Sequence, residues 1–231
     1  MIGKFTSRGR QRYRRLRQVK SVRDRVMNAG TVRTPDGRAH DIFPTGIELD
    51  AGCAIRDWVA NERAVSTIET GLAYAISTLF ICEGLLLTGH PAVHHIAFDP
   101  YQSGHYSGAG RQVIEEAGLA DVVEIQEQDS KIGLAKLVEK NRRFDLGFAD
   151  GDHLFEGVFI DLVFLNRLIR PGGIVIVDDM YLPAVARASK FATTNLGWTS
   201  EQEAVGGEGG MTVFRTPRIP QTRAWDHYVD F

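Results

Sequence analysis

The stretch from Phe144 to Asp179 constrains the fold more than any other part of this 231-residue chain. It holds two short apolar runs, 144–149 and 173–177, and each run ends abruptly in acidic residues. A helical pattern over about 156–169 lies between them and closes with the Pro-Gly stop expected after a helix. A strand–helix–strand order predicts parallel strands, so both acidic clusters should lie at the same carboxyl edge of one sheet.

The carboxyl edge of an open α/β sheet is where such folds bind ligands. The acids expected there are Asp150, Asp152, Asp178 and Asp179, with His153 beside them. Carboxylates at this edge suit a cation, a ribose or a proton transfer, and they contribute nothing to a hydrophobic core.

Strands and helices alternate through most of the chain after residue 64. Strands are predicted over 65–69, 93–98 and 122–125, and helices over 74–87, 110–117, 130–140 and 183–194. Segments 198–203 and 211–215, joined by a glycine-rich link, are expected to form a closing antiparallel pair. This alternation predicts an α/β fold with a doubly wound, mainly parallel sheet and helices on both faces.

The amino-terminal arm is strongly basic. Residues 1–25 hold ten basic residues and one acid, whereas the whole chain has a formal net charge of −2, so the remainder is acidic. An apolar stripe at helical spacing runs along the arm through Tyr13, Leu16, Val19, Val22 and Val26. Such a helix can bind nucleic acid or an anionic membrane. The favoured interpretation is that the stripe packs on the domain or a second subunit.

The segments flanking the main alternation suggest three regions. Pro35-Asp36-Gly37 predicts a hairpin turn, and Asp50 is expected to cap a helix that runs to about Asn61. We therefore expect a basic helical arm with a hairpin over 1–45, a main domain over 46–217 and an irregular tail over 218–231.

Composition narrows the cellular context. The longest apolar run, 79–87, is interrupted by Glu83 and Gly84 and is too short to span a membrane. The arginine-rich start lacks the apolar core of a secretory signal. Cys53 and Cys82 do not indicate a disulfide framework, and Cys82 is expected in the core. A cytoplasmic enzyme is the expectation.

A turn of small residues follows the strand that ends at Glu69. Gly71, Ala73, Ala75 and Ser77 would let a ligand approach the backbone and the helix amino terminus.

Two further positions at this edge suggest a nucleoside. Asp99 closes the next strand, where an acid can accept both hydroxyls of a ribose or simply be a turn residue before Pro100. Asp129 and Ser130 follow the third strand, where they would cap a helix or border an adenine.

Taken together, these motifs resemble the class I S-adenosylmethionine-dependent methyltransferases, particularly small-molecule O-methyltransferases of the catechol, caffeoyl-CoA and macrocin types. The resemblance covers roughly residues 47–216. It rests on Glu69-x-Gly71 with Ser77-Thr78, Asp99-Pro-Tyr-Gln102, Asp150-Gly-Asp-His153, Phe155-Glu-Gly-Val158-x-x-Asp161, and Leu168-x-Arg-Pro-Gly-Gly173 before Asp178-Asp179.

The resemblance implies a Rossmann-like, seven-stranded sheet whose last strand is antiparallel, with 46–217 as the methyltransferase domain. It implies that Glu69 and Gly71 line the methionine end of the cofactor, that Asp99 holds the ribose, and that the Asp129 region borders the adenine. The full set of implied S-adenosylmethionine-binding residues is Glu69, Gly71, Ala73, Ser77, Asp99, Asp129, Ser130 and Asp150. Family members usually carry glycines where this chain has Ala73 and Ala75, whose methyl groups disfavour positive φ.

A metal is expected from the chemistry of the acceptor. A hydroxyl must lose its proton to attack, and a divalent cation held by carboxylates lowers the pKa of that hydroxyl. The resemblance implies Asp150, Asp178 and Asp179 as ligands of Mg²⁺ or another divalent cation. His153 is the expected general base, with Asp150 beside it. Alternatively, Asp179 caps the helix at Pro183 and His153 is a packed, neutral ring.

The predicted function is O-methylation of a hydroxylated small molecule, by an enzyme that is expected to be a homo-oligomer, most simply a homodimer. One alternative is a nucleic-acid methyltransferase that uses the basic arm, and another is a nucleotide-binding module without turnover. A dehydrogenase is disfavoured because the turn lacks spaced glycines. Tyr181, Trp58 and His105 are candidate walls of the acceptor pocket.

Overall fold

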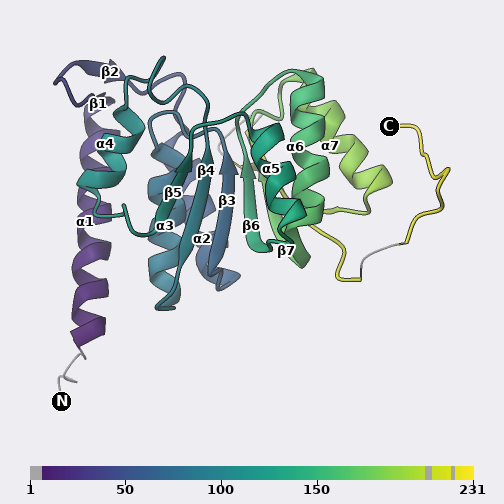
Figure 1. Ribbon diagram of the computed structural model, residues 1–231, viewed down its shortest axis with the longest axis horizontal. Helices are drawn as coiled ribbons and strands as arrows, with labels where there is room; N and C mark the ends of the chain where they lie inside the picture. Colours follow the sequence, from purple (N-terminus) through teal and green to yellow (C-terminus); the bar gives the residue numbers. More distant parts are fainter. Residues whose placement is uncertain (1–6, 206–209, 220–221) are drawn as a thin grey trace.

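The computed structural model describes residues 7–205, 210–219 and 222–231. Within them, seven strands form one sheet in the order β5-β4-β3-β6-β7-β9-β8, and a hairpin, β1 (Thr31–Arg33) with β2 (Ala39–Asp41), stands apart (Figure 1). The sheet strands are β3 (Ser66–Thr70), β4 (His94–Phe98), β5 (Val123–Gln126), β6 (Phe144–Ala149), β7 (Ile169–Val177), β8 (Thr199–Val205) and β9 (Met211–Arg215). The helices are α1 (Ser7–Ala29), α2 (Leu49–Asn61), α3 (Ile76–Thr88), α4 (Ala109–Glu116), α5 (Ser130–Glu139), α6 (Phe155–Leu168) and α7 (Pro183–Asn195).

The strand directions confirm the predicted topology. Strands β3 to β7 are mutually parallel, and β9 runs antiparallel between β7 and β8. The chain moves outward from β3 through β4 to β5 and then crosses to β6 on the other side of β3. The sheet order therefore reverses between β3 and β6, which is the point where doubly wound sheets bind ligands.

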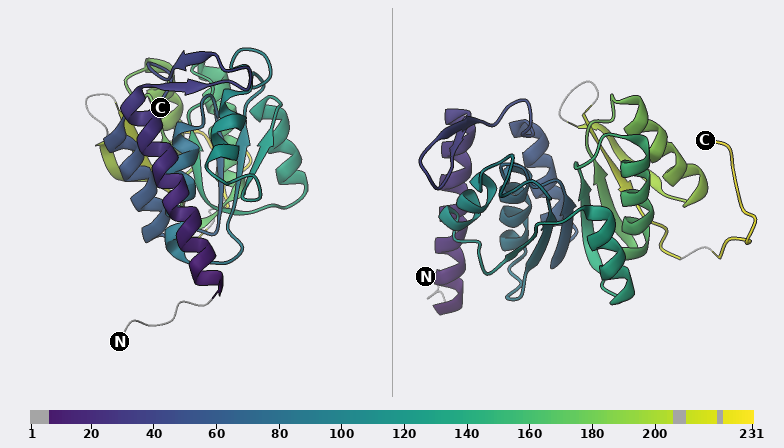
Figure 2. Two further views of the ribbon diagram at one scale, coloured as in Figure 1. Left: turned by 90° about the vertical axis from the view of Figure 1, so that its left-hand side faces the viewer. Right: turned by 45° about the horizontal axis from the view of Figure 1, so that its top comes forward.

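Helices cover both faces of the sheet, as Figure 2 shows from two directions, and a hydrophobic cluster lies on each face. Alternate residues of β7 enter different layers: Ile174 and Ile176 join the cluster of α1 to α4, and Val175 and Val177 join the cluster of α5 to α7. This alternation is the period-two pattern of a strand buried on both faces.

The basic arm forms α1 and packs on the body of its own chain. Val19, Val22 and Val26 are buried in the same cluster as the apolar residues of α3. Tyr13, nearer the start of the helix, is 57% exposed. The apolar stripe of the arm therefore packs on its own chain, as one of the two predicted arrangements, except at Tyr13.

Several predicted element boundaries differ from the structure by one residue or more. Glu48, not Asp50, occupies the N-cap of α2, without a side-chain capping bond, so the predicted cap at Asp50 is wrong. Helix α3 begins at Ile76 rather than residue 74, because the preceding turn is left-handed. Strand β7 begins at Ile169, which pairs with Phe144, earlier than the expected start at residue 173. Most of the glycine-rich link between β8 and β9 lies outside the described residues.

Candidate active site

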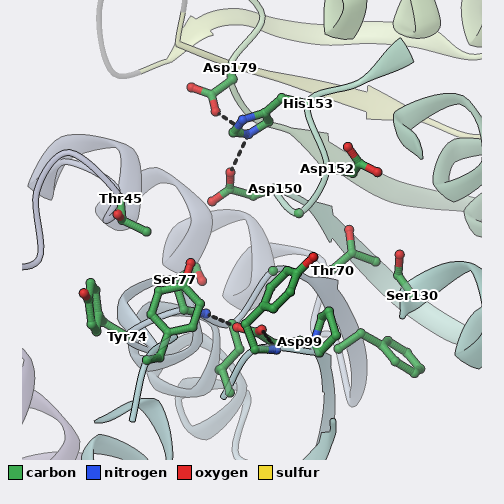
Figure 3. Close-up of a pocket in the computed structure, with 18 of the residues that line it drawn as sticks. Thr45, Thr70, Tyr74, Ser77, Asp99, Ser130, Asp150, Asp152, His153 and Asp179 are labelled. Atoms are coloured by element: carbon green, nitrogen blue, oxygen red, sulfur yellow. Dashed lines mark hydrogen bonds and ion pairs between the residues drawn. The ribbon is translucent and has the colours of Figure 1, made fainter. Parts of the chain in front are cut away.

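A cavity of about 590 Å³ opens at the carboxyl ends of the parallel strands (Figure 3). Its walls come from the turn after β3, the end of β4, the start of α5 and the loops after β6 and β7. The predicted site residues among its lining are Gly71, Ala73, Ser77, Asp99, Asp129, Ser130, Asp150, His153 and Asp179. Acids from three separate strand ends therefore share one cavity.

The turn after β3 follows a glycine-like path. Gly71 has φ +90°, and a Cβ there would lie 2.0 Å from the carbonyl oxygen of Asp150. Ala73 and Ala75 also have positive φ, 44° and 63°. The chain thus keeps the left-handed turn with alanine, which costs roughly 1–2 kcal/mol per residue.

Asp99 is fixed at the end of β4 by the same turn. Its Oδ2 accepts hydrogen bonds from the backbone N–H of Ala73 (2.7 Å) and from Nε2 of Gln102 (2.8 Å), and its Oδ1 accepts from the N–H of Tyr101 (2.8 Å). The side chain is buried but forms part of the cavity wall. Oδ1, which accepts only one of these bonds, retains acceptor capacity for a ligand hydroxyl.

Glu69 lies beneath the cavity and outside its lining. The residue is 0% exposed, and its carboxylate accepts hydrogen bonds from Ser77 Oγ (2.9 Å) and Thr78 Oγ1. His95 Nε2 lies 3.1 Å from the same carboxylate. Glu69 therefore anchors the first turn of α3, and any effect on a cofactor would act through that turn.

The start of α5 forms another wall. Asp129 caps this helix by accepting a hydrogen bond from the Lys131 N–H (2.8 Å), as the capping alternative predicted, and it also lines the cavity. Ser130 Oγ donates to the buried Asp161 (2.8 Å). Lys131 Nζ reaches Asp152 (3.0 Å) and so links this wall to the loop after β6.

A group of three side chains meets between the loops after β6 and β7. Asp150, His153 and Asp179 each offer a potential ligand atom, and these atoms lie within 4.8 Å of one another. His153 Nε2 is 2.8 Å from Asp179 and 3.9 Å from Asp150. Asp178 lies outside this group and borders two neighbouring hollows instead. Asp179 does not cap α7, whose N-cap is Leu182.

The charges of this group perturb one another. Burial raises the pKa of Asp150 well above its usual range, and the nearby Asp178 and Asp179 raise it further. Burial likewise raises the pKa of Asp178. Asp150 and Asp179 together raise the pKa of His153 to about 10. The imidazole is therefore protonated near neutral pH when nothing else neutralises the two carboxylates.

Several cavity residues belong to segments without a transferable sequence pattern. Thr45 and Ile47 come from the segment before α2, and Tyr74 packs edge-on against Tyr106 (5.1 Å between ring centroids). Burial, then the charge of Asp99, raises the pKa of Tyr106 to about 12, so its hydroxyl stays protonated. None of these residues belongs to a motif at a strand end, which is the signal that found the others.

Of the three candidate acceptor walls, one lies at the cavity. Tyr181 lines it and is 64% exposed. Trp58 and His105 are absent from its described lining. Trp58 Nε1 instead donates a hydrogen bond to Gln202 (3.0 Å) on β8.

Known proteins share this architecture. Residues 68–180 match a family model described as a methyltransferase domain. The cofactor-bound protein Rv0187 from MTB aligns with a TM-score of 0.67 and 19% identity, over 87% of this chain and 89% of that one. The O-methyltransferase from Bacillus cereus, in complex with SAH, aligns with a TM-score of 0.66 and 17% identity, over 94% and 93%. The O-methyltransferase TomG from Streptomyces achromogenes, in complex with SAM, aligns with a TM-score of 0.60 and 16% identity, over 94% and 92%.

Two further findings complete the comparison. Curated protein sequences give no significant match to the chain. In the part of the chain that the structure describes, every helix is too short or too polar to cross a membrane. The chain therefore carries a methyltransferase domain over residues 68–180, and it has the same overall fold as these solved structures.

Proposed function

We propose that this methyltransferase transfers the methyl group of S-adenosylmethionine to the hydroxyl of a small molecule. The observation that carries the proposal is the convergence of Asp99 with the group of Asp150, His153 and Asp179 on one cavity. The first could hold the cofactor ribose, and the second could take the acceptor proton. The O-methyltransferases from Bacillus cereus and Streptomyces achromogenes have the same fold.

The cavity suits S-adenosylmethionine by volume and charge. Pockets of about 300–1,000 Å³ hold ligands of this size. Among the described lining residues, the acids outnumber the basic residues Lys131 and His153; the acids are Asp99, Asp129, Asp150, Asp152 and Asp179. Such walls favour a ligand that carries a sulfonium and an ammonium group. We assign the ribose to Asp99, the methionine end to the turn containing Gly71, and the adenine to the side of Asp129.

The donor supplies an electrophilic methyl group on a positively charged sulfur. An acceptor oxygen that has lost its proton forms the new O–CH₃ bond, and the electron pair of the broken C–S bond returns to sulfur. In this chain, Asp150 and His153 stand where they could accept the proton. Because Asp150 and Asp179 raise its pKa to about 10, His153 already carries a proton near neutral pH. It can accept the proton of the acceptor only after these two carboxylates are neutralised and its own pKa falls.

We further propose that Asp150 and Asp179 hold a divalent cation, Mg²⁺ in the simplest case. Their carboxylates are the ligand type that hard cations prefer, and their mutual repulsion makes the group favourable for a positive charge. The cation would lower the pKa of the acceptor hydroxyl and neutralise the two acids beside His153. Asp178, also expected as a ligand from the sequence, stays a prediction.

The assignment of the ribose is tested by cofactor binding. Asp99→Asn should weaken S-adenosylmethionine binding at least about tenfold, because one charged acceptor costs roughly 1.5–3 kcal/mol. Isothermal titration calorimetry measures the affinity, and thermal unfolding checks that the variant is folded. Glu139→Gln, at an exposed residue of α5 outside the cavity, is the control. Wild-type affinity in Asp99→Asn would remove this assignment.

The metal assignment needs a readout that does not depend on turnover. Asp179→Asn should abolish calorimetric binding of Mn²⁺ to the protein, whereas Asp178→Asn should weaken it less because Asp178 lies outside the group of three. Chelation by EDTA should also stop methyl transfer. Turnover that EDTA leaves unchanged, with no Mn²⁺ binding to the wild-type chain, would contradict the proposal.

Nucleic acid is a weaker candidate for the acceptor. Arg10, Arg14 and Arg17 on α1 form no ion pair within the described residues, which favours an anionic partner for the arm. This end of α1 lies beside Gly89, at the end of α3 away from the cavity, and the cavity itself is acidic. Stimulation of turnover by RNA would promote this candidate. A cytoplasmic location and a homodimer also stay predictions.

A further inference from the structure

A second hollow continues the cavity on the side of the carboxylate group. Its volume is about 320 Å³, and it shares part of its lining with the cofactor cavity, including Asp150, Asp179 and Tyr181. We call it the acceptor lobe, defined by the residues that line it: Phe43, Pro44, Thr45, Gly46, Ile47, Glu48, Ala51, Asp150, Asp178, Asp179, Tyr181, Val205 and Gly210. A molecule in this lobe would place a hydroxyl beside the group that is expected to take its proton.

The acceptor lobe combines apolar walls with negative charge. Phe43, Ile47 and Tyr181 give it a hydrophobic surface, of which Phe43 and Tyr181 are 37% and 64% exposed. Its titratable side chains, apart from Tyr181, are all acidic: Glu48, Asp150, Asp178 and Asp179. No arginine, lysine or histidine belongs to the described lining of the lobe.

Glu48 is an exposed acid of this lobe that the other groups do not neutralise. It stands at the N-cap of α2, it is exposed, and it forms no ion pair or side-chain hydrogen bond within the described residues. It also lies outside the group of three proposed to hold the cation. Its charge therefore stays available to an acceptor after that group has been neutralised.

From this arrangement we infer that the acceptor is a hydroxylated molecule with an apolar body and no anionic substituent, and that Glu48 favours an acceptor with a protonated amine. A carboxylate or phosphate in the lobe would face like charges without a basic partner. The inference rests on the proposed O-methyl transfer and names the class of its substrate.

The test compares three catechols of similar size that differ in charge: dopamine, 4-ethylcatechol and 3,4-dihydroxyphenylacetate. Calorimetry measures their binding to the full chain saturated with S-adenosylhomocysteine and Mg²⁺ at low salt. Neutral 4-ethylcatechol should bind at least about fivefold tighter than the anionic acetate, and dopamine at least as tightly as 4-ethylcatechol. High salt should shrink these differences, which a purely steric preference would not do.

Two matched variants assign the charge effect to Glu48. Glu48→Lys should bind the acetate more tightly than dopamine, and Glu48→Gln should lower the preference for dopamine over 4-ethylcatechol. Asp50→Lys, which changes an exposed acid in the first turn of the same helix but outside both linings, should keep the wild-type order. Thermal unfolding of all three confirms that they are folded.

Different outcomes separate this inference from the proposed function. Equal binding of the acetate and 4-ethylcatechol, an unchanged order in Glu48→Lys, or binding of none of the catechols overturns the inference. If the charge order is found but no catechol is methylated, the charge preference of the acceptor lobe stands, and the failure lies in the proposed O-methyl transfer. If S-adenosylhomocysteine itself does not bind, both fall.

Discussion

At the scale of single residues, substitutions at different positions of the turn after β3 should change the stability of the fold by very different amounts. Gly71→Ala should destabilise the fold by roughly 3 kcal/mol or more, because the new methyl group would meet the backbone of Asp150 and the residue would keep a positive φ. Ala73→Gly should leave stability unchanged or slightly raised, since relief of the left-handed strain offsets the greater freedom of glycine when unfolded. Urea unfolding measures both, and equal losses in the two variants would contradict this account.

Residues at this scale also show where sequence reasoning reaches its limit. The carboxyl ends of parallel strands meet at one edge, so the gathering of Asp99, Asp150 and Asp179 could be predicted. The direction of each side chain could not. Glu69 lies on the face of β3 that α3 covers, and so it is buried under the turn. Asp178 and Asp179 are neighbours at a strand end, and only Asp179 turns toward His153.

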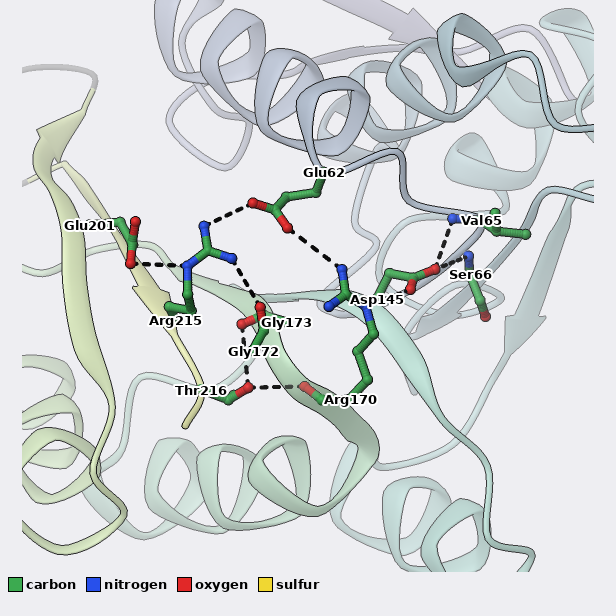
Figure 4. A network of polar contacts seen from close by, with 10 residues as sticks. All are labelled: Glu62, Val65, Ser66, Asp145, Arg170, Gly172, Gly173, Glu201, Arg215 and Thr216. Carbon is green, nitrogen blue, oxygen red and sulfur yellow. Dashed lines mark hydrogen bonds and ion pairs between the residues drawn. The ribbon is translucent and has the colours of Figure 1, made fainter. Parts of the chain in front are cut away.

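At the scale of elements, Asp145 holds three strands together at the amino edge of the sheet, opposite the cavity (Figure 4). Its Oδ2 accepts hydrogen bonds from the N–H groups of Val65 (2.8 Å) and Ser66 (3.0 Å), and Oδ1 accepts from Arg170 Nε (2.8 Å). Burial alone would raise the pKa of Asp145, but these bonds outweigh it and hold the pKa below its usual value.

A lowered pKa makes this contribution depend on pH. The ionised form is the one that folding favours, so the stabilisation is present above the unfolded pKa of about 3.9 and is lost as the pH falls through the lower, folded value. Asp145→Asn should lower the free energy of unfolding by about 1–3 kcal/mol at neutral pH. The difference in the free energy of unfolding between Asp145→Asn and wild type should become smaller below about pH 4.

Urea unfolding across this pH range tests the assignment. Glu139→Gln, at an exposed acid for which no ion pair is seen within the described residues, should match wild type throughout. Asp145→Asn could instead be less stable than wild type by the same amount at every pH at which both proteins are folded. That result would show that the charge of Asp145 does not cause the loss of stability.

The elements themselves were largely predictable, because each strand and helix has a local pattern and a local stop. Their boundaries were less so. Ala73 and Ala75 adopt the left-handed conformation, which alanine disfavours. Helix α3 therefore begins at Ile76, later than the start at residue 74 that composition suggests. The start of β7 at Ile169 depends on pairing with Phe144, a contact between residues far apart in the sequence.

At the scale of the whole molecule, the arm and the sheet domain share one core. Beside the buried valines of α1, Arg23 forms an ion pair with Glu83, a residue of α3 that is 1% exposed, and Lys20 Nζ lies 3.5 Å from the same carboxylate. The sequence alone suggested an appendage over 1–45, because neither the stripe nor the acid in an apolar helix indicates its partner. A buried carboxylate between basic side chains joins the two regions energetically.

The arm should therefore unfold together with the rest of the chain. Urea transitions followed by far-ultraviolet circular dichroism, which reports the helices, and by tryptophan fluorescence should coincide. Glu83→Ala should shift both transitions together, by about 1.5–3 kcal/mol, because Arg23 loses its buried charged partner and keeps only the exposed Asp24. Glu115→Ala, at an exposed acid of α4, provides the comparison. A separate early transition that Glu83→Ala enlarges would instead mean that the arm is an independently melting appendage on a self-sufficient domain.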